Sequence, residues 1–266
     1  MWHSGKRAGC PTRRTSPRAL PKTAKQPAHA VFRRATARPI TLHQYSMILD
    51  IDFVSDFVCP WCFLGRTRLV RALEQVRATH ADLEVRVNWL PFFLNPDTPA
   101  AGEPYRPYLE AKFGGRRGVD EMLGRIAGAA APDGLQFAFD RIATRPNTLP
   151  AHRLTYRAQS QGHTAAQINA LGEALFAAHF QQGRDIGDIA TLVDIAAETA
   201  GDDREDVQAY LESDEDAATV RRMAGQLQKQ GVNGVPFFIF NRRLAVSGAQ
   251  TPAVLGAAVL QSLQNA

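Results

Sequence analysis

Residues 50–65 read DIDFVSDFVCPWCFLG, in which an apolar run leads directly into two cysteines, Cys59 and Cys62. The run from Ile48 to Val54 is rich in β-branched and aromatic residues and predicts a buried strand. Pro60 suits the first position of a helix, where its missing N–H costs nothing. We therefore expect the cysteine pair to begin a helix that directly follows a strand.

This placement predicts disulfide chemistry. A cysteine in the first turn lies near unpaired N–H groups and the positive end of the helix dipole, which favours the thiolate of Cys59. Cys62, about one turn further along, should be more buried and able to attack a mixed disulfide formed at Cys59. Pro60 removes a donor and Trp61 adds apolar surface without charge, so we expect the pair to be only moderately oxidising.

Asp52 and Asp56 stand just before the motif, and either is a candidate proton acceptor for Cys62. For each of them the alternative is a solvated or helix-capping carboxylate.

The cysteine count argues against a metal site and against a secreted disulfide framework. Zinc would need two more ligands beside the pair, and the histidines of residues 47–266 are scattered at His80, His152, His163 and His179. Cys10 lies far from the pair. We therefore expect no metal and no bound cofactor, and a single close pair without a secretory signal indicates reversible redox use in the cytoplasm.

The overall charge of +5 hides two different parts. Residues 1–46 hold ten Lys and Arg and no acidic residue, which leaves 21 basic against 26 acidic residues in the rest. An acidic remainder gives no reason to expect a nucleic-acid partner. No run approaches the roughly 18 apolar residues of a membrane span, so no membrane association is expected.

The basic leader, residues 1–46, contains five prolines and no apolar periodicity, which predicts disorder. It lacks the apolar core of a secretory signal. We expect that translation begins at Met47 or that the leader is dispensable, with a transit peptide or a functional tail as the alternatives.

The rest of the chain predicts an α/β fold in two halves. Residues 47–100 contain the first strand, the cysteine helix and an alternating strand at 83–89, which together form a βαβ unit. Residues 231–266 contain strand patterns at 235–240 and 244–246 and a last helix that starts after Thr251, hence a ββα unit. We expect a mixed four-stranded sheet covered by helices.

Residues 101–230 show apolar stripes at helical spacing and predict an all-helical insertion. The expected N-caps are Thr164, Asp188 and Ser213 or Asp214, and the expected stops are Gly183, Gly201 and Gly231.

Pro236 interrupts an otherwise central strand pattern, where proline removes a ladder hydrogen bond. The pattern makes sense if the Val235–Pro236 bond is cis and faces the cysteine pair, because the backbone groups of Val235 would then be free to pair with an extended substrate.

Several segments in this order resemble the DsbA-like thioredoxin family, and within it the FrnE-like subgroup. They are 56–65 around the cysteines, 145–148 and 151–153 in the insertion, 231–238 around Pro236, and the turn 247–250. The likeness covers residues 47–266. It implies a thioredoxin-like fold, with Cys59 as nucleophile, Cys62 as resolving thiol and Pro236 as the cis-proline.

By this resemblance the chain is expected to be a thiol-disulfide oxidoreductase with a CPWC dithiol. Its partners would be proteins carrying thiols or disulfides, or small thiols, with glutathione as a candidate co-substrate. Neither the direction of the reaction nor the oligomeric state follows from the sequence.

Two alternatives remain open. The chain also resembles glutathione-dependent 2-hydroxychromene-2-carboxylate isomerases and kappa-class transferases, which usually present a serine and do not need a second cysteine. In either case Asn147, His152, Gly248 and Gln250 would line the cleft, although each also fits a structural role in a helix or turn. The other alternative is a noncatalytic peptide-binding or chaperone module that uses an apolar cleft around Trp61 and Pro236.

Overall fold

The computed structural model describes residues 47–264. The predictions for the basic leader 1–46, including Cys10, therefore lie outside the described residues. No helix within the described range is long and apolar enough to cross a membrane.

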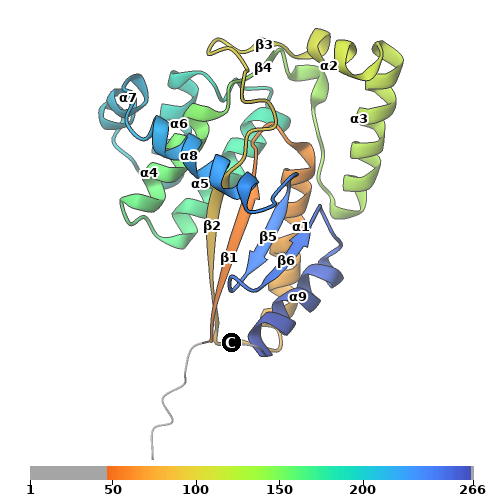
Figure 1. The fold of residues 1–266 in the computed structure, drawn as a ribbon, viewed down its shortest axis with the longest axis vertical. Helices are drawn as coiled ribbons and strands as arrows, with labels where there is room; N and C mark the ends of the chain where they lie inside the picture. Colours follow the sequence, from red (N-terminus) through yellow and green to blue (C-terminus); the bar gives the residue numbers. More distant parts are fainter. Residues whose placement is uncertain (1–46, 265–266) are drawn as a thin grey trace, which may run out of the picture. The chain divides into compact units, whose positions relative to one another are not determined.

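A four-stranded mixed sheet forms the centre of the fold (Figure 1). Its strands are β1 (Met47–Ser55), β2 (Leu83–Pro91), β5 (Phe237–Phe240) and β6 (Leu244–Ser247), in the order β2-β1-β5-β6. β1 pairs parallel with β2 and antiparallel with β5, and β5 pairs antiparallel with β6. The predicted thioredoxin-like sheet is confirmed.

The register brings three aromatic side chains together at the centre of the sheet. Phe53 of β1 is opposite Trp89 of β2 and Phe238 of β5. Its ring centroid lies 5.0 Å from that of Trp89 and 5.1 Å from that of Phe238. All three side chains belong to the main hydrophobic core, which thereby fixes the strands just ahead of the cysteines.

Helices cover both faces of the sheet. The helices α1 (Pro60–Arg77) and α9 (Pro252–Gln264) contact each other and contribute to the core that contains Phe53. Side chains alternate along a strand, so Val54 points to the opposite face. There it packs with Leu227 of α8 (Ala217–Lys229).

The insertion is largely helical, as predicted. Its other α-helices are α2 (Tyr105–Phe113), α3 (Arg116–Ala130), α4 (Leu149–Ser160), α5 (Ala165–Phe180), α6 (Ile189–Ala200) and α7 (Arg204–Glu212). Two short 3-10 helices, Ala131–Asp133 and Phe139–Arg141, follow α3. The departure from an all-helical segment is an antiparallel pair of two-residue strands, β3 (Glu103–Pro104) and β4 (Thr144–Arg145).

The predicted caps are partly right. Thr164 begins α5 with a capping box, Asp188 caps α6, and Gly201 ends α6 in the left-handed conformation. The prediction for α8 is wrong: Ser213 ends α7, and α8 begins after Asp216, whose φ is 60°. Gly183 and Gly231 lie beyond the helix ends at Phe180 and Lys229.

The insertion is bound tightly to the sheet at Trp89. A Cβ atom added to Gly172 of α5 would lie 2.5 Å from the indole ring, so only glycine allows this approach. The Gln159 side chain of α4 accepts a hydrogen bond from the Trp89 N–H and donates one to its carbonyl oxygen. It thereby satisfies the backbone of an edge strand that would otherwise be open.

Candidate active site

The two cysteines lie where the sequence predicts, at the start of α1. Cys59 is the N-cap residue and Pro60 is the first helical residue. Both thiols are free, and the two cysteines come within 3.3 Å of each other. Cys59 is 4% exposed and Cys62 is completely buried. An incoming group can therefore reach Cys59 first.

Cys62 is held in its protonated form by its surroundings. Burial raises the pKa of its thiol well above the ordinary value, and the hydrogen bond to Cys59 and the charge of Cys59 act in the same direction. The negative charge of Asp56 raises this pKa further, whereas a hydrogen bond from the Asp56 backbone lowers it. Cys62 therefore must give up a proton before it can act as a nucleophile.

Asp56 lies directly behind the motif and is 1% exposed. Its carbonyl oxygen accepts the Cys59 N–H at 2.9 Å, and its Oδ2 accepts the Leu94 N–H at 2.8 Å. Its Oδ1 has no hydrogen-bond partner and lies 3.6 Å from Nε2 of His152, another buried side chain. The structure thus brings Asp56 and His152 together next to Cys62.

Asp52 lies elsewhere. Alternation along β1 places it on the face opposite Phe53, and its Oδ1 accepts a hydrogen bond from the Asn88 amide at 2.8 Å. Of the two carboxylates that the sequence offers as proton acceptors, Asp56 is therefore the one that influences Cys62.

The Val235–Pro236 peptide bond is cis, and its segment faces the cysteines. The Cys59 thiol lies 3.8 Å from the Val235 carbonyl oxygen. Within residues 47–264 the Val235 N–H has no hydrogen-bond partner. Gly65 of α1 lies against the proline ring, since a Cβ atom added there would be 2.9 Å from Cγ of Pro236.

Gly248 holds this segment by a backbone hydrogen bond, and Gln250 lies in the same turn as Gly248. The Gly248 N–H donates to the Pro236 carbonyl oxygen at 2.8 Å. The Gln250 side chain donates to the Ser247 carbonyl oxygen within its own turn. Neither residue lines the cavity beside Cys59, because both are engaged in shaping the turn.

A cavity of about 330 Å³ opens beside Cys59. On one side it is lined by Val58, Cys59, Pro60, Trp61 and Val235. The opposite wall comes from the insertion, with Tyr105, Tyr108, Leu109 and Phe113 of α2 and Met122, Leu123 and Ile126 of α3. The reactive thiol therefore faces a largely apolar wall.

The chain matches the family model of the DSBA-like thioredoxin domain over residues 50–260. It belongs to this family. It is 30% identical to a probable DsbA oxidoreductase from Streptomyces coelicolor, with a TM-score of 0.71 over 82% of this chain and 91% of that one.

Two more distant structures share the fold. A 2-hydroxychromene-2-carboxylate isomerase is 16% identical, with a TM-score of 0.58 over 81% of this chain and 97% of that one. The cytosolic disulfide reductase DsbM from Pseudomonas aeruginosa, solved with GSH, is 19% identical, with a TM-score of 0.55 over 81% of this chain and 99% of that one. At these levels of identity, the two likenesses concern the fold alone.

Asn147 lies outside the cavity of this DsbA-like site. Its amide donates to the Thr98 carbonyl oxygen and accepts the Leu149 N–H at the start of α4. It lines a separate cavity of about 200 Å³, next to Phe93 and Arg221. In the described structure its side chain holds the loop just before α4, whose N-cap residue is Thr148.

The described residues contain no group of three or more His, Cys, Asp or Glu side chains that could hold a metal ion. His152 approaches Asp56, and His163 pairs with Asp202 at 2.7 Å.

The sequence analysis did not predict that the insertion forms one wall of the cavity beside Cys59. The signal was present at 105–113, where Tyr105, Tyr108, Leu109 and Phe113 follow helical spacing. Such a stripe normally indicates a buried core face, yet Phe113 is 40% exposed at the cavity. Which face of α2 meets Cys59 depends on tertiary packing that periodicity does not reveal.

Proposed function

We propose that the chain is a thiol-disulfide oxidoreductase in which Cys59 is the nucleophile and Cys62 the resolving thiol. The observation that carries the proposal is the position of Cys59, which is an N-cap residue between its buried partner and the Val235 backbone. An N-cap thiol lies beside the unpaired N–H groups of the first helical turn, a position that reactive cysteines commonly occupy.

In the reducing direction, the Cys59 thiolate attacks one sulfur of a substrate disulfide, and the second substrate sulfur leaves as a thiolate. Cys62 then loses its proton and attacks the Cys59 sulfur, which releases the first substrate thiolate. The substrate gains two electrons, and Cys59 and Cys62 end as a disulfide that a dithiol or two small thiols must reduce again. The Val235 amide, which has no partner within residues 47–264, can pair with an extended substrate backbone.

We assign Asp56 as the base that accepts the proton of Cys62, and His152, next to Asp56, as a second group that assists it. The carboxylate is buried, has one oxygen without a partner and acts on the pKa of Cys62. Asp56→Asn keeps an oxygen for the Leu94 N–H but removes the base. The Asn variant should accumulate the mixed disulfide at Cys59, with a resolution step slowed roughly 100-fold, and unchanged resolution would remove Asp56 from the mechanism.

The function is tested by reduction of insulin disulfides and by exchange in glutathione redox buffers. Cys59→Ser should abolish both, and Cys62→Ser should trap Cys59 in a mixed disulfide. A glutathione-dependent isomerase or transferase would behave differently, because its reaction on a small aromatic substrate would survive Cys62→Ser. Aggregation suppression that persists in the double serine variant, without any exchange activity, would support a peptide-binding module instead.

Exchange in glutathione redox buffers also gives the reduction potential of the cysteine pair, and hence the direction in which it acts. We expect a moderately oxidising pair, since Trp61 brings no charge to the motif, and a reducing cellular compartment as its place of action.

A further inference from the structure

The surface around the Cys59 cavity is unusually apolar for an exposed region. Trp61, Leu94 and Phe113 are 38%, 41% and 40% exposed, and all three line the cavity. They come from three separate segments, α1, the loop after β2 and α2. Large apolar side chains that gather at the mouth of a cavity indicate a binding surface rather than scattered exposure.

Two charged residues line this cavity, and both are basic. Arg145 is buried, lies 3.8 Å above the Tyr108 ring and pairs with Glu103. Lys112 is exposed, lies 3.1 Å from the Tyr108 hydroxyl and pairs with no carboxylate of the described residues. No acidic side chain lines the cavity.

The two helices that form the insertion's wall of the cavity, α2 and α3, are basic as well. Residues 105–130, which cover α2 and α3, contain five Arg or Lys against three acidic residues. The three acidic residues, Glu110, Asp120 and Glu121, are already paired with Arg106 and Arg117. Residues 105–130 therefore carry a net positive charge, whereas residues 47–266 as a whole are acidic.

We infer that the cavity selects cysteine-containing peptide segments that place a large apolar side chain next to the disulfide and a carboxylate close to it. The apolar group enters between Trp61 and Phe113, and the carboxylate faces Lys112. This assignment deepens the proposed function and rests on it, since the sulfur attacked is the one presented to Cys59. Glutathione disulfide offers carboxylates but no large apolar group, so it fills only part of this site.

The test measures second-order rate constants of the reduced full-length protein with disulfide peptides that differ at two positions. One position next to the cysteine is Phe or Gly, and a nearby position is Glu or Lys. The Phe peptides should react roughly tenfold faster than the Gly peptides, since burial of one aromatic side chain contributes free energy of that order. The Glu peptide should react roughly threefold faster than the Lys peptide at low salt.

Substitutions at two residues of α2 test whether this helix causes the two peptide preferences. Lys112→Glu should invert the Glu-to-Lys preference, whereas Lys229→Glu at the exposed end of α8 should leave it unchanged. Phe113→Ser should reduce the Phe-to-Gly preference. Equal rates for all peptides, an unchanged preference in Lys112→Glu, or glutathione disulfide reacting as fast as the Phe and Glu peptide would each overturn the inference.

Hydroxyethyl disulfide, which is small and uncharged, separates this outcome from a failure of the proposed function. If the wild-type protein exchanges with it but shows no preference among the peptides, the redox function stands and the selectivity is wrong. If no disulfide reacts at all, the redox function is wrong and the selectivity fails with it.

Discussion

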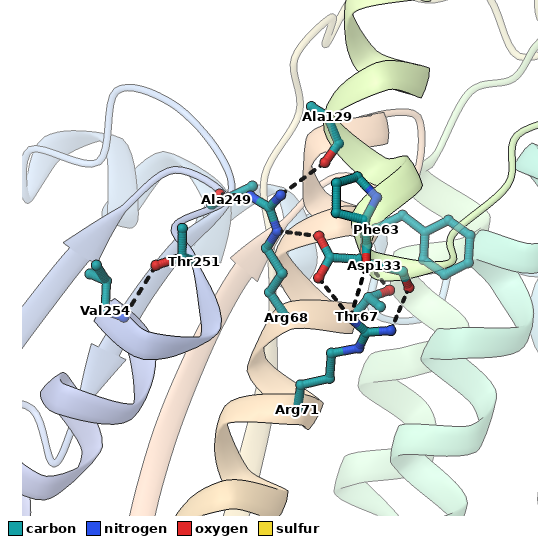
Figure 2. A network of polar contacts seen from close by, with 10 residues as sticks. Phe63, Thr67, Arg68, Arg71, Ala129, Asp133, Ala249, Thr251 and Val254 are labelled. Atoms are coloured by element: carbon teal, nitrogen blue, oxygen red, sulfur yellow. Dashed lines mark hydrogen bonds and ion pairs between the residues drawn. The ribbon is translucent and has the colours of Figure 1, made fainter.

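Arg68 of α1 donates a hydrogen bond from Nη1 to the carbonyl oxygen of Ala249, 2.7 Å away. Ala249 belongs to the turn whose Gly248 N–H donates to the Pro236 carbonyl oxygen. The same guanidinium pairs through Nε with Asp133, which follows α3 (Figure 2). One side chain therefore joins the helix of the two cysteines, the segment that faces them and the helix that walls the cavity.

Asp133→Asn is expected to destabilise the protein by about 3 kcal/mol, because it removes the charge that balances Arg68 in a mostly buried pair. Arg68 and Arg71 contact different oxygens of the carboxylate, and the asparagine amide offers only one oxygen for the two guanidinium groups. The free energy of unfolding by urea measures the effect. The control is Glu121→Gln, whose exposed pair with Arg117 should contribute less than about 1 kcal/mol. Equal losses in the two variants would contradict this account of the pair.

Gly65→Ala should displace Pro236, because the added Cβ atom would lie 2.9 Å from the proline ring and 3.2 Å from the Phe238 ring. We expect a loss of about 1–3 kcal/mol in stability, together with slower disulfide exchange. Gly128→Ala in α3 is the matched control, since its Cβ atom meets nothing within 4 Å. That substitution should stabilise the helix by roughly 0.5–1 kcal/mol. A neutral Gly65→Ala would show that the proline segment moves freely.

The stability of the reduced protein should fall in alkaline solution because of Cys62. Burial raises the pKa of this thiol, whereas a thiol of the unfolded chain titrates near about 8.5. The contribution is present in full below that value. As the pH rises further, the unfolded chain loses its proton first, and the free energy of unfolding falls by up to about 1.4 kcal/mol per pH unit. Urea unfolding from pH 7 to 10 measures the slope, which should be shallower in Cys62→Ala.

His179 should make the protein sensitive to acid. Burial lowers its pKa to about 4, so its contribution is present in full above the unfolded pKa of about 6.5 and is lost as the pH falls through the folded value. The loss between these limits amounts to about 3 kcal/mol. His179→Phe, which keeps a ring against Phe180, should unfold at lower pH than the wild type in an acid titration. An unchanged midpoint would exclude His179 as the cause.

Local signals in the sequence were sufficient for most of the fold. Pro60 and Thr164 mark helix starts because their side chains act on the first turn itself. The start of α8 was mispredicted because Asp216 adopts a positive φ and makes no side-chain cap hydrogen bond. Strand β5 begins two residues later than its apolar pattern, since Pro236 has no N–H for the ladder.

Part of the candidate site could likewise be predicted from the sequence, and part of it could not. The cysteines and Pro236 follow from the order of strands, because the topology brings the start of α1 opposite the start of β5. Asp56 and Asp52 could not be told apart, since their faces depend on where β1 ends. Lys112 and Phe113 were missed because only the packing of α2 against α3 turns them toward Cys59.

The contact of Gly172 with the Trp89 ring has a consequence for protein engineering. A segment of α5 backbone lies directly on a side chain of the central sheet, and the same indole contacts Phe53, Phe57 and Phe176. Excising residues 101–230 would therefore strip one side of this aromatic cluster and expose it to water. The helical insertion therefore cannot be removed without loss of core packing. A minimal redox domain cut from this chain would need a redesigned surface at β2.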